Sequence, residues 1–140
     1  MPNALVPEFA VSDFANSKTF YCDVLGFQVA YERPEEGFAY LSLGEAELMI
    51  DQIGAGRTFD DGHLPEGYPF GRGLNVQIEV PSIAPLLKAL EAVGHELYLT
   101  PEDKWYRNDE IEVGNRQFVV ADPDGYLLRF FEDLGARPVD

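Results

Sequence analysis

The order of predicted elements occurs twice along the chain, and this duplication is the strongest constraint on its fold. A strand at Leu5–Val11 precedes a helix that ends at Gly26 and then three strands. A strand at Leu74–Val80 precedes a helix that ends at Gly94 and again three strands. Neither half can bury its sheet alone, so the halves have to fold together. We therefore predict an α+β fold of two tandem βαβββ modules, with a helix on each outer face and a concave cleft formed by the sheets.

Local signals set the bounds of these elements. Ser12 or Asp13 is suited to cap the first helix, and Ser82 the second. The glycine that follows each helix can adopt the left-handed conformation that ends it. The strands of the first half are expected at Gln28–Arg33, Phe38–Leu43 and Ala46–Gln52. Those of the second half are expected at about Glu96–Thr100, Glu112–Ala121 and Leu127–Glu132, with Pro101–Asp109 irregular or an edge strand.

A long segment, Ile53–Gly73, separates the two halves. It holds six glycines, two prolines and the aromatic residues Phe59, Tyr68 and Phe70. Long loops inside a compact domain are more often functional than idle. We predict one domain over residues 1–140, with a first module at 1–53, a linker loop at 54–73 and a second module at 74–140.

The stretch Gln117–Glu132 predicts a β-hairpin. Proline and glycine in the Asp122-Pro123-Asp124-Gly125 sequence favour a type I turn between two short apolar strands. The period of two places Leu127, Arg129 and Phe131 on one face of the second strand. An arginine between apolar neighbours indicates a specific partner on that face.

Composition excludes several classes of function. Ten basic and 25 acidic residues give a net charge of −15, which repels nucleic acid and anionic membranes and attracts cations. Solubility alone is the other explanation of this acidity. No apolar run approaches the length of a bilayer span, and the first residues lack a signal-peptide pattern, so a cytoplasmic protein is expected. The single cysteine, Cys22, is interpreted as a packed thiol.

Two motifs resemble a known superfamily. VPEFAVSDFANSKTFYCDVLGF is similar to the opening of vicinal-oxygen-chelate proteins, and DPDGYLLRFFE is similar to their closing hairpin. The resemblance covers essentially the whole chain and implies the paired-module fold. This superfamily includes glyoxalase I, fosfomycin-resistance thiol transferases, extradiol dioxygenases and bleomycin-resistance proteins, so the fold does not select one function.

The residues at the metal-ligand positions argue against catalysis. In the metalloenzymes, histidine or glutamine begins the first strand of each module, and glutamate ends the closing motif. By this resemblance, the residues at the matching positions of this chain are Val6, Asn75 and Arg129. Valine cannot ligate, a neutral amide is a poor ligand, and arginine places a fixed positive charge where a cation would bind. His63 and His95 match no ligand position and are interpreted as surface residues. The resemblance thus implies no metal, no cofactor and no catalytic residue.

Two further segments resemble the non-enzymatic bleomycin-resistance branch. These are ALVPEFAVSD and EVGNRQFVVADP. Proteins of this branch are acidic homodimers that sequester a cationic glycopeptide in grooves at the subunit interface without changing it. The implied function is antibiotic resistance by binding a small cationic organic ligand. The tryptophan of those proteins corresponds to Gly114 here, whereas the only tryptophan of this chain is Trp105.

Several residues are candidates for ligand contact, each with a structural alternative. Phe38 and Tyr40 share a strand face, where they could stack on a planar ligand or pack in the core. Asp51 follows an apolar run, where its carboxylate could bind a cation or lie at a solvated strand end. The full set of candidate ligand-binding residues is Phe38, Tyr40, Asp51, Phe59, Tyr68, Phe70, Asn75, Trp105, Tyr106, Arg116 and Arg129.

The candidates of the second half include two aromatic residues and two arginines. Polar neighbours predict that Trp105 and Tyr106 are exposed and cover a ligand or a partner. Arg129 could pair with a carboxylate of the cleft such as Glu8 or Glu79, and Arg116 could do likewise.

Two rival functions remain open from the sequence. One is a metal-dependent lyase, isomerase or dioxygenase that uses carboxylates such as Glu8, Asp51 or Glu79. The other is a ligand-free module whose cleft serves only to pair subunits. The metal content of the purified protein separates the enzyme from the binding protein.

Overall fold

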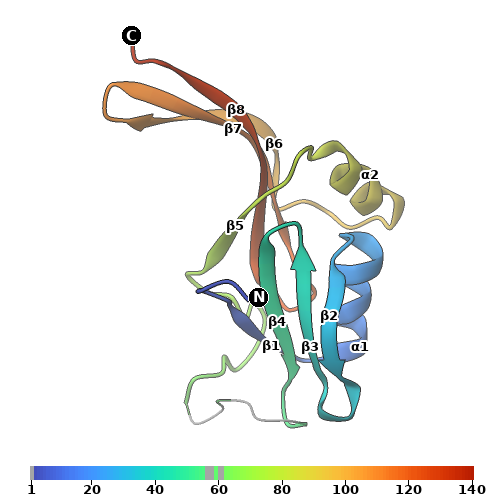
Figure 1. Ribbon diagram of the computed structural model, residues 1–140. Coiled ribbons are helices and arrows are strands. Elements are labelled where there is room, and N and C mark those ends of the chain that lie inside the picture. The colour runs from blue at the N-terminus through green and yellow to red at the C-terminus, as the bar shows by residue number, and fades with distance from the viewer. Residues whose placement is uncertain (1, 56–58, 60–61) are drawn as a thin grey trace. The chain divides into compact units, whose positions relative to one another are not determined.

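A computed structural model describes residues 2–55, 59 and 62–140, and the chain forms two compact units (Figure 1). The first unit runs to Gly73 and also contains Asp122–Tyr126. The second unit comprises Leu74–Ala121 and Leu127–Asp140. None of the helices in the described ranges is long and apolar enough to cross a membrane.

The first unit is a four-stranded sheet with one helical segment. Its strand order is β1-β4-β3-β2; β1 and β4 are parallel, and the other neighbours are antiparallel. Its elements are β1 (Glu8–Val11), α1 (Phe14–Lys18), a π-helical turn (Thr19–Val24), β2 (Gln28–Arg33), a 3₁₀ turn (Pro34–Glu36), β3 (Phe38–Leu43) and β4 (Ala46–Gln52).

The second unit repeats this topology. Its strand order is β5-β8-β7-β6, again with a parallel first pair, β5 and β8. Its elements are β5 (Asn75–Glu79), α2 (Ala84–Ala92), β6 (Leu99–Asn108), β7 (Ile111–Ala121) and β8 (Leu127–Pro138). The repeated βαβββ order confirms the prediction of an α+β fold of two modules.

The helix ends follow the local chemistry that the sequence indicates. The Asp13 side chain accepts a hydrogen bond from the Asn16 backbone N–H, as an N-cap residue does. Gly26 and Gly94 end the helical segments with φ of 85° and 67°, which favour glycine. The second helix differs from expectation, because its N-cap is Ile83 and the Ser82 hydroxyl accepts only a 3.3 Å bond from Ala84 N.

Three strand predictions require correction. The first strand begins at Glu8 rather than Leu5, since Pro7 has no N–H for the ladder. The strand expected at about Glu96–Thr100 begins only at Leu99 and runs to Asn108 as the edge strand β6, so the edge-strand alternative for Pro101–Asp109 is confirmed for most of that segment. A register shift between Leu99 and Glu102 accommodates Pro101. The closing hairpin is not short, because β7 and β8 continue as a paired ribbon to Ile111 and Pro138.

One face of each sheet carries the apolar core. In the first unit, Phe9, Leu41 and Ile50 are at most 2% exposed, together with Tyr21 from the π-helical turn. In the second, the predicted alternation of β8 is confirmed, because Leu128 and Phe130 are fully buried while Arg129 is half-buried. These buried faces leave the opposite faces available for polar and aromatic side chains.

A buried polar network fixes the Asp122–Tyr126 turn within the first unit. The Asp122 carboxylate accepts hydrogen bonds from Tyr21 Oη at 2.7 Å and from the backbone N–H groups of Asp124 and Tyr126, each at 2.9 Å. Asp124 in turn accepts a bond from the Ser12 backbone N–H at 3.0 Å. The Tyr126 ring stacks on Phe9 with ring centroids 4.2 Å apart.

Candidate functional site

The strand register places aromatic and acidic side chains on one face of the first sheet. Phe38 lies opposite Asp51, and Tyr40 lies opposite Met49, on antiparallel strands β3 and β4. Because β-strand side chains alternate, these residues lie opposite the apolar core face. We call the surface that carries Phe38, Tyr40 and Asp51 the site face.

Tyr31 of β2 extends the aromatic part of the site face. Its ring stacks on Tyr40 with centroids 5.1 Å apart and lies 5.9 Å from the ring of Phe38. Phe38 and Tyr40 are 5% and 6% exposed, whereas Tyr31 is 51% exposed. Both predicted aromatics are therefore largely covered, and Tyr31 presents the accessible ring. The sequence showed Tyr31 only as an ordinary strand residue.

A cavity of about 260 Å³ adjoins the acidic end of the site face. Its lining residues come from β1, β4, the 53–73 loop and the closing turn: Glu8, Ala10, Asp51, Phe59, His63, Leu64, Pro65, Phe70 and Tyr126. Three of the predicted site residues, Asp51, Phe59 and Phe70, thus come together. Tyr68 does not line this cavity and is 64% exposed.

Asp51 is the most enclosed carboxylate of this cavity, at 6% exposure. Burial raises the pKa of Asp51 above its ordinary value, and the nearby carboxylate of Glu8 raises it further. The positive charge of Arg33 lowers the pKa of Asp51 and so offsets part of this increase. A cation bound between Asp51 and Glu8 would relieve this repulsion, so the site favours positively charged groups.

Six of the nine lining residues were absent from the set of sequence candidates, and three of these six carry an ionisable side chain: Glu8, His63 and Tyr126. Glu8 was considered only as a metal ligand or ion-pair partner, His63 only as a surface residue, and Tyr126 only as part of a strand. His63 is exposed and also lines the cavity. The parallel β1–β4 pairing brings Glu8 near Asp51, and Tyr126 reaches β1 by stacking on Phe9 and by donating a hydrogen bond to the Ala10 carbonyl oxygen at 2.9 Å. No local signal in the sequence indicates these contacts.

The corresponding face of the second sheet carries a polar cluster. The Gln117 side-chain amide donates to Tyr106 Oη at 2.7 Å and to Glu102 at 3.0 Å. Arg129 donates to the same Tyr106 oxygen at 3.3 Å. Gln117 is 2% exposed, which makes this cluster an internal part of the sheet. Tyr106 is accordingly half-buried and bonded within the sheet rather than exposed.

The expected ion pair of Arg129 with Glu79 is absent from the described part of the chain. The hydrogen-bond partner of Arg129 is instead the neutral Tyr106 hydroxyl. The strand register explains the outcome, because Arg129 pairs with Gln77 and Val119 and not with an acidic residue. The alternative partner, Glu8, belongs to the other unit, so that pairing stays a prediction.

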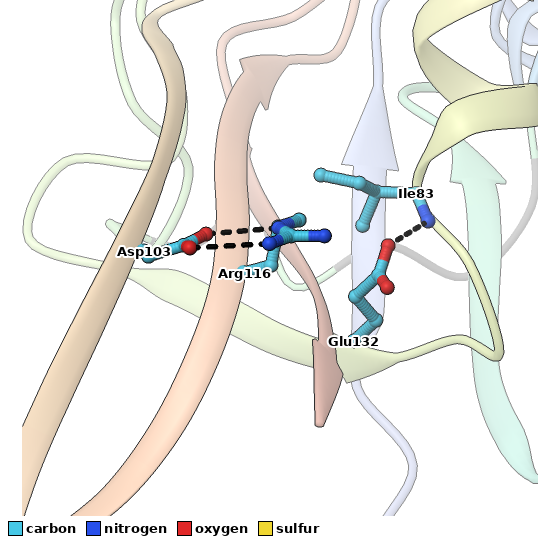
Figure 2. Close-up of polar contacts among 4 residues, drawn as sticks. All are labelled: Ile83, Asp103, Arg116 and Glu132. Carbon is cyan, nitrogen blue, oxygen red and sulfur yellow. Dashed lines mark hydrogen bonds and ion pairs between the residues drawn. The ribbon is translucent and has the colours of Figure 1, made fainter. Parts of the chain in front are cut away.

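Arg116 forms an exposed ion pair on the opposite face of the second sheet. Its guanidinium donates to both oxygens of Asp103 at 2.9 and 3.2 Å, which lowers the pKa of Asp103 (Figure 2). On the neighbouring strand, Glu132 accepts a bond from Ile83 N at 3.0 Å and so caps the start of α2. These charged contacts link strands β6, β7 and β8 and the start of α2, and a ligand contact of Arg116 stays a prediction.

Trp105 is half-buried, which corrects the expectation of an exposed ring. One side of the indole lies against Gly114, where an added Cβ would be 2.7 Å from the ring. The Arg137 guanidinium lies over the ring at 3.9 Å from its centroid. Arg137 also donates to Glu112 at 2.9 Å.

The remaining candidates do not form a metal centre in the part of the chain that the structure describes. Asn75 is exposed and pairs with Leu127 in the β5–β8 ladder. His95 is not a surface residue as expected: it is half-buried, and its Nε2 lies 2.8 Å from the Ala121 carbonyl oxygen. Within the described residues, no group of three or more His, Cys, Asp or Glu side chains is arranged to hold a metal ion.

Sequence comparison identifies the family to which this arrangement belongs. The profile of the Glyoxalase/Bleomycin resistance protein/Dioxygenase superfamily matches residues 5–130. This chain belongs to that superfamily. Bleomycin resistance proteins from Geobacillus stearothermophilus and Staphylococcus aureus are each 31% identical to it over 138 residues, covering 92% of this chain and 96% of theirs.

Solved structures of two other proteins have a similar fold. TioX from Micromonospora sp. ML1 is 22% identical, with a TM-score of 0.69 over 94% of this chain and 100% of that protein. A lactoylglutathione lyase from Agrobacterium tumefaciens is 16% identical, with a TM-score of 0.61 over 94% of this chain and 95% of that one. At these identities the structural likeness establishes the fold alone, and the choice of function rests on the residues of the site.

Proposed function

We propose that this protein binds and sequesters a small cationic organic ligand of the bleomycin class and leaves it chemically unchanged. The observation that carries the proposal is the cavity in which Asp51 and Glu8 lie beside the rings of Phe59, Phe70 and Tyr126. The likeness to bleomycin resistance proteins over most of both chains supports the same ligand class.

The size of the cavity defines how such a ligand would bind. At about 260 Å³ it is smaller than the roughly 300–1,000 Å³ of typical small-molecule sites, so it accommodates one group of a larger ligand. A positively charged group is attracted by the two carboxylates and by the faces of the aromatic rings that line the cavity. The half-exposed Tyr31 on the same sheet face offers a surface for a planar group to stack.

A pair of charge-matched variants tests the role of Asp51. We expect Asp51→Asn to weaken bleomycin binding about five- to tenfold in equilibrium dialysis at low salt, because it removes the enclosed carboxylate. Glu66→Gln removes the same charge from an exposed position of the 53–73 loop outside the cavity and should change affinity less than twofold. Equal effects of the two substitutions would show that net charge alone attracts the drug.

Metal-independent action is part of the proposal. Val6, Asn75 and Arg129 stand where the metalloenzymes of the superfamily are expected to have ligands, and Arg129 bonds to Tyr106 instead. Elemental analysis of the purified protein should detect less than stoichiometric transition metal. About one zinc, nickel, manganese or iron ion per chain would instead support a lyase, isomerase or dioxygenase.

We also propose a cytoplasmic homodimer as the acting form. Pro7 interrupts the ladder at the start of β1 and provides a position at which the N-terminal residues could cross to a partner. Light scattering at micromolar concentration should return twice the 15.7 kDa of one chain. A mass of one chain at every concentration would contradict this part of the proposal.

A further inference from the structure

The strands of the second unit hold an aromatic ring that is covered by a cation of the same chain. The Arg137 guanidinium lies 3.9 Å from the centroid of the Trp105 ring, a distance at which a cation is attracted to the ring face. Trp105 belongs to β6 and Arg137 to β8, on either side of β7. The contact with Arg137 shows that this face of the Trp105 ring can accommodate a planar cation.

The indole is also held against the backbone of β7. A Cβ built on Gly114 would lie 2.7–2.8 Å from three atoms of the Trp105 ring, so only glycine leaves room for it there. The indole cannot move toward β7 to receive a ligand. A ligand that stacks on the ring face covered by Arg137 therefore has to take the place of Arg137.

Glu112 completes the arrangement as the counter-charge. Its carboxylate accepts a hydrogen bond from Arg137 Nε at 2.9 Å, and the two side chains are 26% and 50% exposed. Partly exposed ion pairs are weak, because water competes for both charges. The guanidinium can therefore leave at small cost, and Glu112 is then free to pair with another cation.

The first unit contains the same combination. The Arg33 guanidinium lies 4.1 Å from the centroid of the Phe38 ring and pairs with Glu36. Phe38 belongs to the site face already described. Both units thus contain an aromatic ring, an arginine of the same chain over it and a glutamate that pairs with this arginine.

We propose that Arg137 is a specificity-determining residue that occupies a planar-cation subsite formed by Trp105 and Glu112. A ligand enters this subsite by displacing Arg137, and its own planar cationic group, such as a guanidinium, an amidinium or a charged heteroaromatic ring, then stacks on Trp105 and pairs with Glu112. Ligands without such a group leave Arg137 in place. This inference rests on the proposed binding function.

Titration of the sole tryptophan with metal-free bleomycin at low salt tests the proposal. Arg137→Gln should raise the affinity at least threefold, because no internal cation competes for the ring. Lys88→Gln is the matched control: it removes one positive charge from α2 in the same unit, away from the subsite, and should leave the affinity within 1.5-fold of wild type. The double variant Glu112→Gln/Arg137→Gln should lose most of the gain, because the ligand loses its counter-charge.

Acrylamide quenching of Trp105 provides a readout without ligand. Arg137→Gln should increase the quenching constant by about half or more, since the ring face that Arg137 covers becomes accessible, while Lys88→Gln should not. Unchanged quenching in Arg137→Gln would contradict the contact itself and overturn the inference.

The binding results separate this inference from the proposed function. Equal affinities of wild type and Arg137→Gln would overturn the role of Arg137 and leave drug binding intact. Binding that calorimetry detects without any change in Trp105 emission would likewise overturn the role of Arg137 and leave drug binding intact. Absence of binding by every variant would overturn both, and binding by Arg137→Gln alone would support the inference.

Discussion

Trp105 and Gly114 face each other across β6 and β7, and the indole fills the space that a side chain at position 114 would need. The family resemblance implies a tryptophan at position 114, nine residues after the only tryptophan of this chain. In the folded protein these two positions are cross-strand neighbours. The aromatic ring therefore comes from the adjacent strand, and glycine at position 114 makes room for it.

Gly114→Ala tests this relationship. The added methyl group would lie 2.7 Å from the indole, and Arg137 covers the ring, so we expect a loss of about 1–3 kcal/mol in the free energy of unfolding. Urea denaturation measures the change. In a Trp105→Ala background, Gly114→Ala should lower the free energy of unfolding much less, because the indole that the added methyl group would contact is absent. Equal costs in both backgrounds would contradict the contact.

Tyr21→Phe should destabilise the first unit. The hydroxyl of Tyr21 donates a 2.7 Å hydrogen bond to Asp122, and both residues are at most 2% exposed. Loss of a bond to a buried charged acceptor costs about 1.5–3 kcal/mol of unfolding free energy. Tyr98→Phe, at a residue that is 70% exposed, is the matched control and should cost less than about 0.5 kcal/mol. Similar losses in the two variants would contradict the importance of the buried bond.

Asp122 should titrate well above an ordinary aspartate. Burial raises the pKa of Asp122 to about 6, although the bonds from Tyr21 and from two backbone N–H groups lower it. The folded state therefore favours the protonated form. The contribution of Asp122 to stability is fully present below its ordinary pKa of 3.8 and is lost as the pH rises through about 6.

Carbon-13 NMR of the Asp122 carboxyl group measures this pKa directly. The midpoint should fall near 6 in the wild type and move higher in Tyr21→Phe, because the Tyr21 bond stabilises the ionised form. A midpoint near the ordinary 3.8 in the folded protein would show that the three hydrogen bonds outweigh the cost of burial.

Asp51→Asn should stabilise the protein while weakening its proposed binding. The pKa of Asp51 is raised by burial and by Glu8, so the folded state disfavours its charge and the cost appears as the pH rises. We expect the variant to melt about 1–4 °C higher than wild type at pH 8, with a smaller difference at pH 5. A lower melting temperature at pH 8 would contradict the unfavourable burial of this charge.

The sequence was sufficient for the order of the elements along the chain and for the two-module fold. Strand alternation, the helix-ending glycines Gly26 and Gly94 and the Asp122–Gly125 turn each have a local physical cause that can be identified without the structure. The lengths of β7 and β8 could not be found in this way. Their extension through Gly135 depends on pairing between strands rather than on the propensity of either one.

The candidate site was predictable only in part, for the same reason. Asp51 carried a local signal, a carboxylate at the end of an apolar strand, and it does line the cavity with Phe59 and Phe70. Glu8 and Tyr126 join it through contacts between segments far apart in the sequence. The coverage of Trp105 by Arg137 likewise depends on the register of β6, β7 and β8, which the sequence does not specify.

Isothermal calorimetry of bleomycin with the wild-type protein tests the central claim most directly. We expect micromolar or tighter binding at low salt, about −8 kcal/mol at the micromolar level, and a weaker affinity as salt rises, because screening reduces the attraction between the −15 charge of the chain and a cationic ligand. No heat and no competition at tens of micromolar drug in low salt would contradict the proposed function.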